Sequence, residues 1–488
     1  MVIGVDFDNT LVGYDELFER LAAERGLSTV AGKKAIRDQI RQLPDGDIEW
    51  QKLQGIAYGP RLSEAKLIDG VSRFFAVCRK HGIPVHIISH KTEFAGYDNT
   101  RTNLRQAALA WMKAHDLPEA HFGSTRAEKL ALIRKLGCTV FIDDLEETFL
   151  EPDFPASVEK ILFTPHDHAP VPGVHICRSW QEIFDRVFLT ALLGRSIGAM
   201  KWIGGGGNSR IYKLEGPVAG KVYFQRQRLD VEFATLQFLW QNSFRCVPQP
   251  IAADPVAHIA VYEFIEGTKP MPTAADIDIA VDFLVRLKGL TGDLPTAAEA
   301  CFSVGEIVRN IDDRLKRLAG VLALQKFLRE EFQPLFDRLR QLPDTPADER
   351  TLSPSDFGFH NALRRLDGSL AFLDFEYFGW DDPAKMVSDF LLHPAMDLSE
   401  NLKHRFAAGI YRHFNKNLAK RVETVYPLFG LKWVTIMLNE FLPEDLQRRG
   451  FAAGRTLDRA AAQARQLEKA RRMLQRIERE YESFPYRD

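Results

Sequence analysis

Three polar side chains between Ser353 and Pro383 have the types and the spacing that phosphoryl transfer requires. Asn361 follows Asp356 by five residues, and Asp374 comes after a segment that predicts a strand, an Asp-Gly turn and a second strand. Transfer from a nucleotide needs one carboxylate to orient the attacking hydroxyl, and an amide and a second carboxylate to hold magnesium. The three residues supply these groups in that order. Taken alone, the stretch also fits an ordinary polar loop with a hairpin.

A second group of such residues lies in the first third of the chain, where predicted strands end in acids or hydroxyls. In chain order the residues are Asp6, Asp8 and Thr10, then Ser89, then Lys129, and then Asp143 and Asp144. Unpaired buried carboxylates are costly, so acids that directly follow an apolar strand are unusual. Ligands of open α/β sheets bind at the carboxyl ends of the strands, and these acids therefore predict a site there.

In this order the motifs Asp-x-Asp-x-Thr, Ser, Lys and Asp-Asp resemble those of the haloacid-dehalogenase-like phosphatases, over about residues 1–190. The resemblance implies an α/β N-terminal domain over 1–193, with a Rossmann-like parallel sheet and a helical cap at about 15–80. It implies that Asp6 is the catalytic nucleophile that forms an aspartyl-phosphate. Asp8 would protonate the leaving oxygen and then deprotonate the attacking water.

The same resemblance implies phosphate and metal ligands. The phosphate-binding residues are Thr10, Ser89 and Lys129, and the Mg²⁺ ligands are Asp6, Asp8, Asp143 and Asp144. Three separate alternatives stay open. Ser89 could cap a turn, and Lys135 could take the role of Lys129. Asp144 could contact the metal ligands without binding the metal itself. Beside Ser89, the side chains of His90, Lys91 and Glu93 either reach the substrate or are solvated.

A glycine-rich loop begins the second half of the chain. Gly204 to Gly207 precede Asn208 and Ser209, between two predicted strands, and glycines there let backbone N–H groups approach phosphates. The P-loop pattern is absent. Lys221 lies in a predicted strand and Glu232 on the helix that follows.

With the stretch 353–383, these motifs resemble the aminoglycoside phosphotransferase and choline kinase branch of the protein-kinase-like fold. The resemblance implies an α+β C-terminal domain over 200–488, in which Asp356 is catalytic and Asn361 and Asp374 bind Mg²⁺. The implied nucleotide-binding residues are Gly205, Gly206, Gly207, Asn208, Ser209, Lys221, Glu232, and Glu263 and Ile265 of a hinge. The family usually has His-Gly-Asp at the catalytic loop, whereas Pro354 and Ser355 precede Asp356 here. Glu376 and Asp382 are acceptor or structural contacts.

Composition limits the function classes. The chain has 488 residues, of which 45% are hydrophobic and 27% charged, which is enough for two or three domains. A net charge of −2 argues against nucleic acid or an anionic membrane as the main partner. Five scattered cysteines without a CxxC pair indicate reduced thiols, and no apolar run approaches the ~18 residues of a membrane span. We expect a soluble cytoplasmic protein.

Apolar residues recur at helical spacing from Leu457 to Tyr481, opposite a basic face. A terminal helix packed on the core is the favoured interpretation, and homo-oligomerisation through this helix is the alternative.

Together the motifs predict a bifunctional enzyme. One half is a Mg²⁺-dependent phosphatase of a small-molecule phosphate ester. The other is a kinase that uses ATP or GTP to phosphorylate a hydroxyl of a sugar, polyol or amino alcohol. One alternative is a phosphatase with a catalytically silent nucleotide-binding regulatory domain. A less favoured one is nucleic-acid end processing, against which the charge and the missing P-loop argue.

Overall fold

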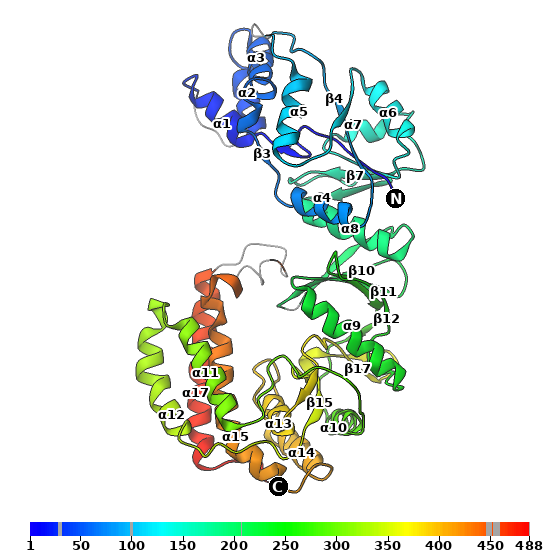
Figure 1. Cartoon of the computed structure of the whole chain (residues 1–488). Helices are drawn as coiled ribbons and strands as arrows, with labels where there is room; N and C mark the ends of the chain where they lie inside the picture. The colour runs from blue at the N-terminus through cyan, green and yellow to red at the C-terminus, as the bar shows by residue number, and fades with distance from the viewer. Residues whose placement is uncertain (28–31, 98–100, 206, 446–450, 452–458, 488) are drawn as a thin grey trace. The chain divides into compact units, whose positions relative to one another are not determined.

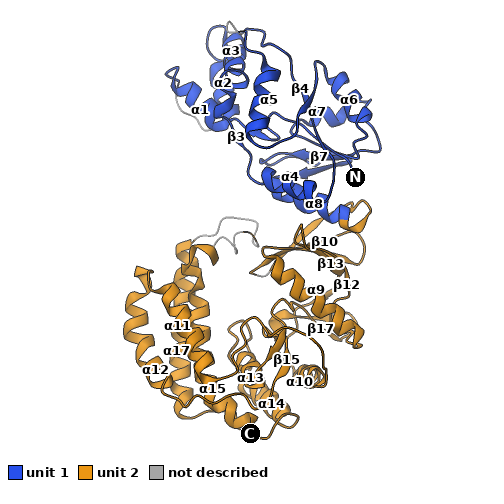
Figure 2. Cartoon of the chain, in the orientation of Figure 1, with its two compact units in different colours: residues 1–191 blue, residues 192–488 orange. Residues whose placement is uncertain are grey.

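The computed structural model describes residues 1–27, 32–97, 101–205, 207–445, 451 and 459–487. The chain divides into two compact units, residues 1–191 and 192–488 (Figure 2). Each unit is described by itself.

Unit 1 is built on a six-stranded parallel sheet in the order β5-β4-β1-β6-β7-β8 (Figure 1). The strands are β1 (Ile3–Val5), β4 (Val85–His90), β5 (Ala120–Gly123), β6 (Val140–Asp143), β7 (Glu159–Phe163) and β8 (Val174–Cys177). Strand β1 lies between β4 and β6 and pairs in parallel with both. The carboxyl ends of these three strands therefore meet at one edge of the sheet, as the sequence predicts for Asp6, Ser89 and Asp143.

Helices cover this sheet and also form a separate insertion. The helices are α1 (Asp15–Ala23), α2 (Lys33–Ile40), α3 (Gly46–Tyr58), α4 (Val71–Lys80), α5 (Leu104–Ala114), α6 (Arg126–Lys135), α7 (Glu146–Leu150) and α8 (Trp180–Leu193). The insertion contains α1 to α3. It is closed by the antiparallel pair of β2 (Val12–Gly13) and β3 (Lys66–Leu67).

Helix α4 falls within the stretch of about 15–80 that is predicted as a cap, and it follows the strand pair that closes the insertion. Helix α4 follows β3, and its Phe74 ring lies 5.0 Å from Trp180 and 5.8 Å from Phe188, both on α8. Figure 1 shows α4 beside α8 and apart from α1 to α3. The apolar spacing of α4 is the same for a cap helix and a sheet-covering helix, so the sequence pattern did not separate them.

Unit 2 begins with a five-stranded antiparallel sheet in the order β12-β13-β11-β10-β9, followed by a helical region (Figure 1). The strands are β9 (Lys201–Gly204), β10 (Ser209–Lys213), β11 (Val218–Tyr223), β12 (Pro250–Asp254) and β13 (Ile259–Glu263), and α9 (Arg226–Gln241) follows β11. The helices of the second region are α10 (Ala274–Lys288), α11 (Val304–Leu318), α12 (Gln333–Leu339), α13 (Pro383–Leu392), α14 (Glu400–Tyr411), α15 (Leu418–Met437) and α17 (Arg459–Glu482).

Short strands frame the stretch that carries Asp356. They are β14 (Gly267–Thr268), β15 (Thr351–Ser353), β16 (Ala362–Arg365), β17 (Leu370–Phe372) and β18 (Gly379–Asp381). Strands β16 and β17 pair as the predicted hairpin, and Gly368 in its turn has φ of 84°, a conformation that favours glycine. The chain is not continuously helical between α11 and α12, because Val321 adopts an extended conformation there.

Helix α17 packs against α15 within unit 2. A Cβ atom on Gly430 of α15 would overlap the side chain of Ile477, so the glycine permits the close approach of the two helices. Ala470, Met473 and Leu474 of α17 are also buried. The tail is thus packed on the core, as the favoured interpretation predicts, and Leu457 lies outside the described residues. None of the helices within the described ranges is long and apolar enough to cross a membrane.

Candidate active sites

The loop that carries Asp356 in unit 2 is fixed by contacts on its N-terminal side. Strand β15 ends at Ser353, whose hydroxyl accepts a hydrogen bond from the backbone N–H of Ser355 at 3.0 Å. Ser355 has φ of 67°, a left-handed conformation that a residue with a side chain adopts at some cost. The Lys385 ammonium donates to the Ser355 hydroxyl at 2.8 Å, which offsets part of that cost.

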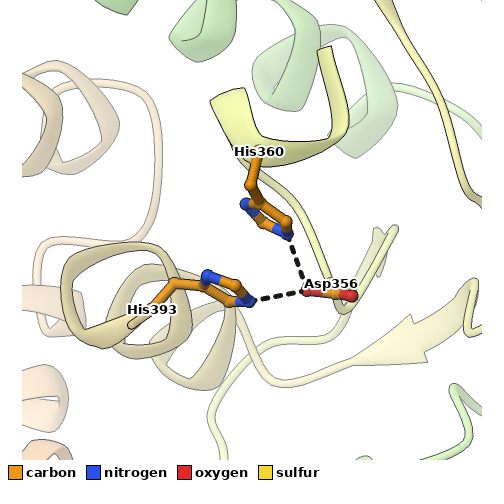
Figure 3. Close-up of side chains that lie close together, drawn as sticks. All are labelled: Asp356, His360 and His393. Carbon is orange, nitrogen blue, oxygen red and sulfur yellow. Dashed lines mark hydrogen bonds and ion pairs between the residues drawn. The ribbon is translucent and has the colours of Figure 1, made fainter. Parts of the chain in front are cut away.

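Two imidazoles hold the Asp356 carboxylate (Figure 3). Nε2 of His360 lies 3.0 Å from Oδ1 of Asp356, and Nε2 of His393 lies 3.1 Å from the same oxygen. Burial alone would raise the pKa of Asp356, but the bonds from His360 and His393 lower it well below its ordinary value. Asp356 is therefore a carboxylate at neutral pH.

Buried Lys221 and Glu232 form an ion-pair cluster with half-buried Asp374. The Lys221 ammonium on β11 lies 2.7 Å from Oε2 of Glu232 on α9 and 2.9 Å from Oδ1 of Asp374. Tyr223 also donates to Oε2 of Glu232, at 2.7 Å. Asp374 has φ of 65°, and its neighbour Leu373 donates its N–H to the Asn361 carbonyl. The predicted metal ligands Asn361 and Asp374 are thus on adjoining backbone segments.

The donor set around Asp374 fits Mg²⁺. Ligand oxygens of Glu232, Asp374 and Glu376 lie within 4.8 Å of one another, and oxygen-only ligands suit a hard cation. Asn208 donates to Oε1 of Glu376, whereas Oε2 is buried and has no hydrogen-bond partner in the described part of the chain. Burial and repulsion from Asp374 raise the pKa of Glu376 to about 7. A bound cation would relieve both costs.

The Asp356 carboxylate and the acids Asp374 and Glu376 border the same cavity, which has a volume of about 580 Å³. Asp356, Asp374, Glu376 and Asn208 line it. Further lining residues come from α11, α13 and α15, including Trp433. The cavity therefore reaches from the glycine-rich loop to the helical region, with Asp356 and Asp374 both at its wall.

In unit 1, Lys129 joins the acids at two strand ends. Its ammonium lies 2.6 Å from Oδ1 of Asp6 and 2.6 Å from Oδ2 of Asp143, and all three side chains are buried. Ligand oxygens of Asp6, Asp143 and Asp144 lie within 4.8 Å of one another, a donor set that fits Mg²⁺. Lys135 is exposed at the end of α6, so only Lys129 is placed at the acids.

The pKa values of these acids reflect crowding of negative charge. Burial raises the pKa of Asp6 well above its ordinary value, with Lys129 opposing this and Asp143 and Asp144 adding to it. Burial and repulsion from Asp143 raise the pKa of Asp144 to about 7. One ammonium thus faces three carboxylates, which is the charge pattern of a site that gains from a cation.

Asp8 lies with a different set of groups. The Lys91 ammonium contacts its Oδ2 at 2.8 Å, and the Tyr14 hydroxyl donates to its Oδ1 at 2.5 Å. The side chain is outside the three-carboxylate group, so the geometry suits proton transfer better than the predicted role as a metal ligand. Lys91, one of the open alternatives, is buried and directed at Asp8 instead of being solvated.

Two predicted phosphate contacts are buried at the same strand ends. The Thr10 hydroxyl donates to Oδ1 of Asp144 at 3.4 Å, and Ser89 is buried in β4. From the insertion, the Lys33 ammonium donates to Asn9 at 2.9 Å and to the Tyr58 hydroxyl at 2.8 Å. The insertion therefore touches the Asp-x-Asp-x-Thr loop through Lys33.

Comparison with protein-family models gives a match in the second half of the chain. Residues 201–423 match the family model described as "Phosphotransferase enzyme family". The C-terminal unit carries a phosphotransferase-family domain. No curated protein matches the chain.

Solved structures similar to the chain include an aminoglycoside phosphotransferase, APH(2'')-IIa, in complex with gentamicin. Its identity is 15%, its TM-score is 0.45, and the match covers 59% of this chain and 95% of that one. A choline/ethanolamine kinase family protein from Mesorhizobium loti has 19% identity and a TM-score of 0.40. The match covers 59% of this chain and 98% of that protein. A choline kinase from Streptococcus pneumoniae has 14% identity and a TM-score of 0.43. The match covers 61% of this chain and 100% of that protein.

In the phosphotransferase domain, the glycine-rich loop leads into β10. Gly205 and Gly207 are exposed, Asn208 and Ser209 are buried, and Gly206 lies outside the described residues. Asn208 ties this loop to Glu376, and it also donates to the Tyr377 hydroxyl at 2.9 Å.

The predicted hinge of the phosphotransferase domain follows β13. The N–H of Glu263 donates to the Gln249 carbonyl, so it is not available to an adenine ring. Ile265 is buried two residues further on. Asp382, left as an acceptor or structural contact, caps α13 and pairs with Arg421 at 2.6 Å, which is a structural role.

Sequence reasoning missed His360 and His393 as partners of Asp356. His360 lies between Asp356 and Asn361, and its position four residues after an acid on a tight turn was a usable signal. His393 is 37 residues from Asp356 and has no local signal, because only the fold of α13 brings it there.

Proposed function

We propose that this chain is a bifunctional enzyme: a Mg²⁺- and nucleotide-dependent small-molecule kinase joined to a Mg²⁺-dependent phosphatase. The observation that carries the kinase half is the shared cavity of Asp356 and Asp374, with Lys221 beside Asp374 and Glu232. A family-level phosphotransferase match over 201–423 supports the same reaction class.

In the proposed transfer, a hydroxyl of the acceptor donates a hydrogen bond to Asp356. The hydroxyl oxygen forms a bond to the terminal phosphorus of the nucleotide, and the bond from that phosphorus to the bridging oxygen breaks. Asp356 has a low pKa, so it orients the hydroxyl and accepts its proton late. Lys221 offsets charge on the nucleotide phosphates. When bound, Mg²⁺ would neutralise phosphate oxygens from a site made by Asn361, Asp374 and Glu376.

For the phosphatase half, the proposal rests on the buried Asp6, Lys129 and Asp143 cluster. A carboxylate oxygen of Asp6 attacks the phosphorus of the ester, and the ester oxygen leaves with a proton from Asp8. Asp8 then takes a proton from water, which attacks the aspartyl-phosphate and releases phosphate. When bound, Mg²⁺ would offset charge on the phosphoryl oxygens from a site made by Asp6, Asp143 and Asp144.

Substrate access to the phosphatase site requires movement of the cap. Asp6 is only 5% exposed, and the cap residue Lys33 is bonded to Asn9 beside it. Opening of α1 to α3 would admit the ester, and closure would exclude bulk water during the reaction.

An acceptor screen tests the kinase half. The purified chain is incubated with Mg²⁺, with ATP or GTP, and with sugars, polyols, amino alcohols and aminoglycosides in parallel. An Asp6→Ala protein is screened alongside, because an active phosphatase could remove the product. Nucleotide-dependent phosphorylation of at least one class, lost with Asp356→Ala, is the expected result. Nucleotide binding without transfer to any acceptor would instead favour a regulatory nucleotide-binding domain.

A further inference from the structure

The contacts of Asp356 point to two residues that control how it meets its acceptor. We infer that His360 and His393 are positioning residues that jointly hold Oδ1 of Asp356 and reserve Oδ2 for the acceptor hydroxyl. The inference rests on the proposed kinase function.

Both imidazoles approach the same carboxylate oxygen from different parts of the fold. His360 belongs to a 3-10 turn (Phe359–Asn361) just after Asp356, and His393 is the residue that ends α13. Their Nε2 atoms lie 3.0 Å and 3.1 Å from Oδ1 (Figure 3). Among the described residues, no side chain or backbone group is bonded to Oδ2. With two donors on one oxygen, a turn of the carboxylate that exchanges its oxygens would break two hydrogen bonds.

The two rings also fix each other. They are stacked with centroids 3.7 Å apart and planes 9° apart, as Figure 3 shows. The ring of His393 packs edge-on against Trp433 at 4.7 Å, and the Trp433 indole N–H donates to Asp389 at 2.9 Å. Rotation of either imidazole is therefore opposed by its neighbour, and a site held by packed side chains keeps its geometry.

The two residues that precede Asp356 make no hydrogen bond to its carboxylate among the described contacts. Pro354 has no backbone N–H to donate and no polar side chain, and it stands two residues before Asp356. The Ser355 hydroxyl is bonded to Lys385. Among the described residues, the side chains bonded to the Asp356 carboxylate are those of His360 and His393, from later in the chain.

The exposure of the Asp356 side chain agrees with an Oδ2 atom that is open to the cavity. The Asp356 side chain is 33% exposed, whereas His360 and His393 are each 10% exposed. Asp356 and His393 both line the 580 Å³ cavity. The carboxylate therefore presents to the cavity the part that the imidazoles leave uncovered.

The same three groups could also bind a transition metal, because one carboxylate and two imidazoles converge. The environment of Nδ1 of His360 argues against a metal site. It is buried and has no hydrogen-bond partner within the described ranges. A metal on Nε2 would put a proton on Nδ1, and metal-bound imidazoles almost always donate that proton to a partner. A hydrogen bond from Nε2 leaves Nδ1 as an acceptor lone pair, which avoids a buried unpaired N–H.

Steady-state kinetics of alanine and glutamine variants test the positioning role, with the acceptor found in the screen. His393→Ala and His360→Ala are expected to lower kcat by about 10- to 100-fold and to leave KM for the nucleotide within about twofold, since only orientation of the hydroxyl is lost. Glutamine keeps an amide N–H donor, so His393→Gln is expected to recover part of kcat. Exposed His413 is the matched control, and His413→Ala should leave kcat unchanged. Equal losses with Gln and Ala, or a rise in nucleotide KM that matches the fall in kcat, would overturn the role.

A measurement without turnover separates this inference from the proposed function. In ¹⁵N-histidine NMR, the resonances of His360 and His393, assigned with the Gln variants, should report protonated Nε2 atoms that shift in Asp356→Asn. Protonated Nδ1 atoms with bare Nε2 atoms would overturn the hydrogen bonds. A Co²⁺ absorption band that His393→Gln removes would show a metal site and overturn the inference. Intact Nε2–H signals in a chain that transfers to no acceptor would refute the kinase proposal and the positioning role together, and would leave the contacts as structural.

Discussion

The ammonium of Lys221 lies 2.7 Å from the carboxylate of Glu232, and both side chains are almost fully buried. Burial alone would lower the pKa of Lys221, but Asp374 and Glu232 raise it well above its ordinary value, so the lysine is charged. Strand β11 and helix α9 thus hold a fixed positive charge beside Asp374, which lines the cavity.

Replacement of Lys221 by methionine should weaken nucleotide binding by at least tenfold. The variant also leaves Glu232 and Asp374 without their cation, so the free energy of unfolding should fall by about 3–5 kcal/mol. Calorimetric titration with ATP and urea unfolding measure the two effects. The double variant Lys221→Met/Glu232→Gln should recover part of the stability but not the affinity. An unchanged affinity in Lys221→Met would contradict the nucleotide role.

Glu376→Gln should change both the metal requirement and the pH dependence of stability. The folded-state pKa of Glu376 is raised to about 7, so the stabilising effect of its protonated form is complete below the unfolded pKa of about 4.3 and is lost as pH rises through 7. Urea unfolding in EDTA should therefore show Glu376→Gln gaining stability relative to the unmodified chain between pH 5 and pH 8. Under turnover, the variant should need more Mg²⁺ for half-maximal rate. A constant stability difference across this pH range would argue against the raised pKa.

Two lysines on α6 provide a matched pair of variants for the proposed phosphatase site. Lys129→Met leaves buried Asp6 and Asp143 without their ammonium, and a loss of about 3–5 kcal/mol of unfolding free energy is expected in EDTA. Lys135→Met removes an exposed charge and should change stability by less than about 0.5 kcal/mol. Phosphatase activity should be lost only in the first. Loss of activity in Lys135→Met with retention in Lys129→Met would reverse the assignment.

The contact of α15 with α17 makes Gly430 sensitive to substitution. Gly430→Ala places a Cβ against Ile477, and such overpacking typically costs about 1–3 kcal/mol. Gly320→Ala is the control, because a Cβ there meets no atom within 4 Å. Thermal unfolding should show a lower Tm for Gly430→Ala alone. Equal Tm values for the two variants would mean that α17 does not pack as described.

Local patterns and the geometry of parallel sheets together predicted part of each site. The hairpin between Asn361 and Asp374 follows from its apolar runs and the Asp-Gly turn. The placement of Asp6, Ser89 and Asp143 at one sheet edge follows from the geometry of parallel strands. The pairing of Lys221 with Glu232 could be predicted because the two residues lie on a strand and on the helix that directly follows it.

Contacts between distant segments that neither a motif nor a shared sheet edge connects could not be predicted from the sequence. His393 reaches Asp356 only because α13 ends beside the loop that carries Asp356, and Asn208 contacts Glu376, which is 168 residues away in the sequence. The sequence does not separate α4 from α1 to α3, because its apolar face suits either a cap helix or a sheet-covering helix. Tyr14 and Lys91 were not assigned to Asp8, since neither side chain carries a motif that names its partner.

The central claim is that the chain contains two independent phosphate sites, and one pair of variants tests it most directly. Phosphate release from the ester and phosphoryl transfer to the acceptor are measured in the same preparations of the unmodified, Asp6→Ala and Asp356→Ala proteins. We predict that Asp6→Ala loses hydrolysis and keeps transfer, and that Asp356→Ala loses transfer by about 10²- to 10⁴-fold and keeps hydrolysis. Loss of both activities in either variant, or transfer that survives Asp356→Ala, would contradict the account.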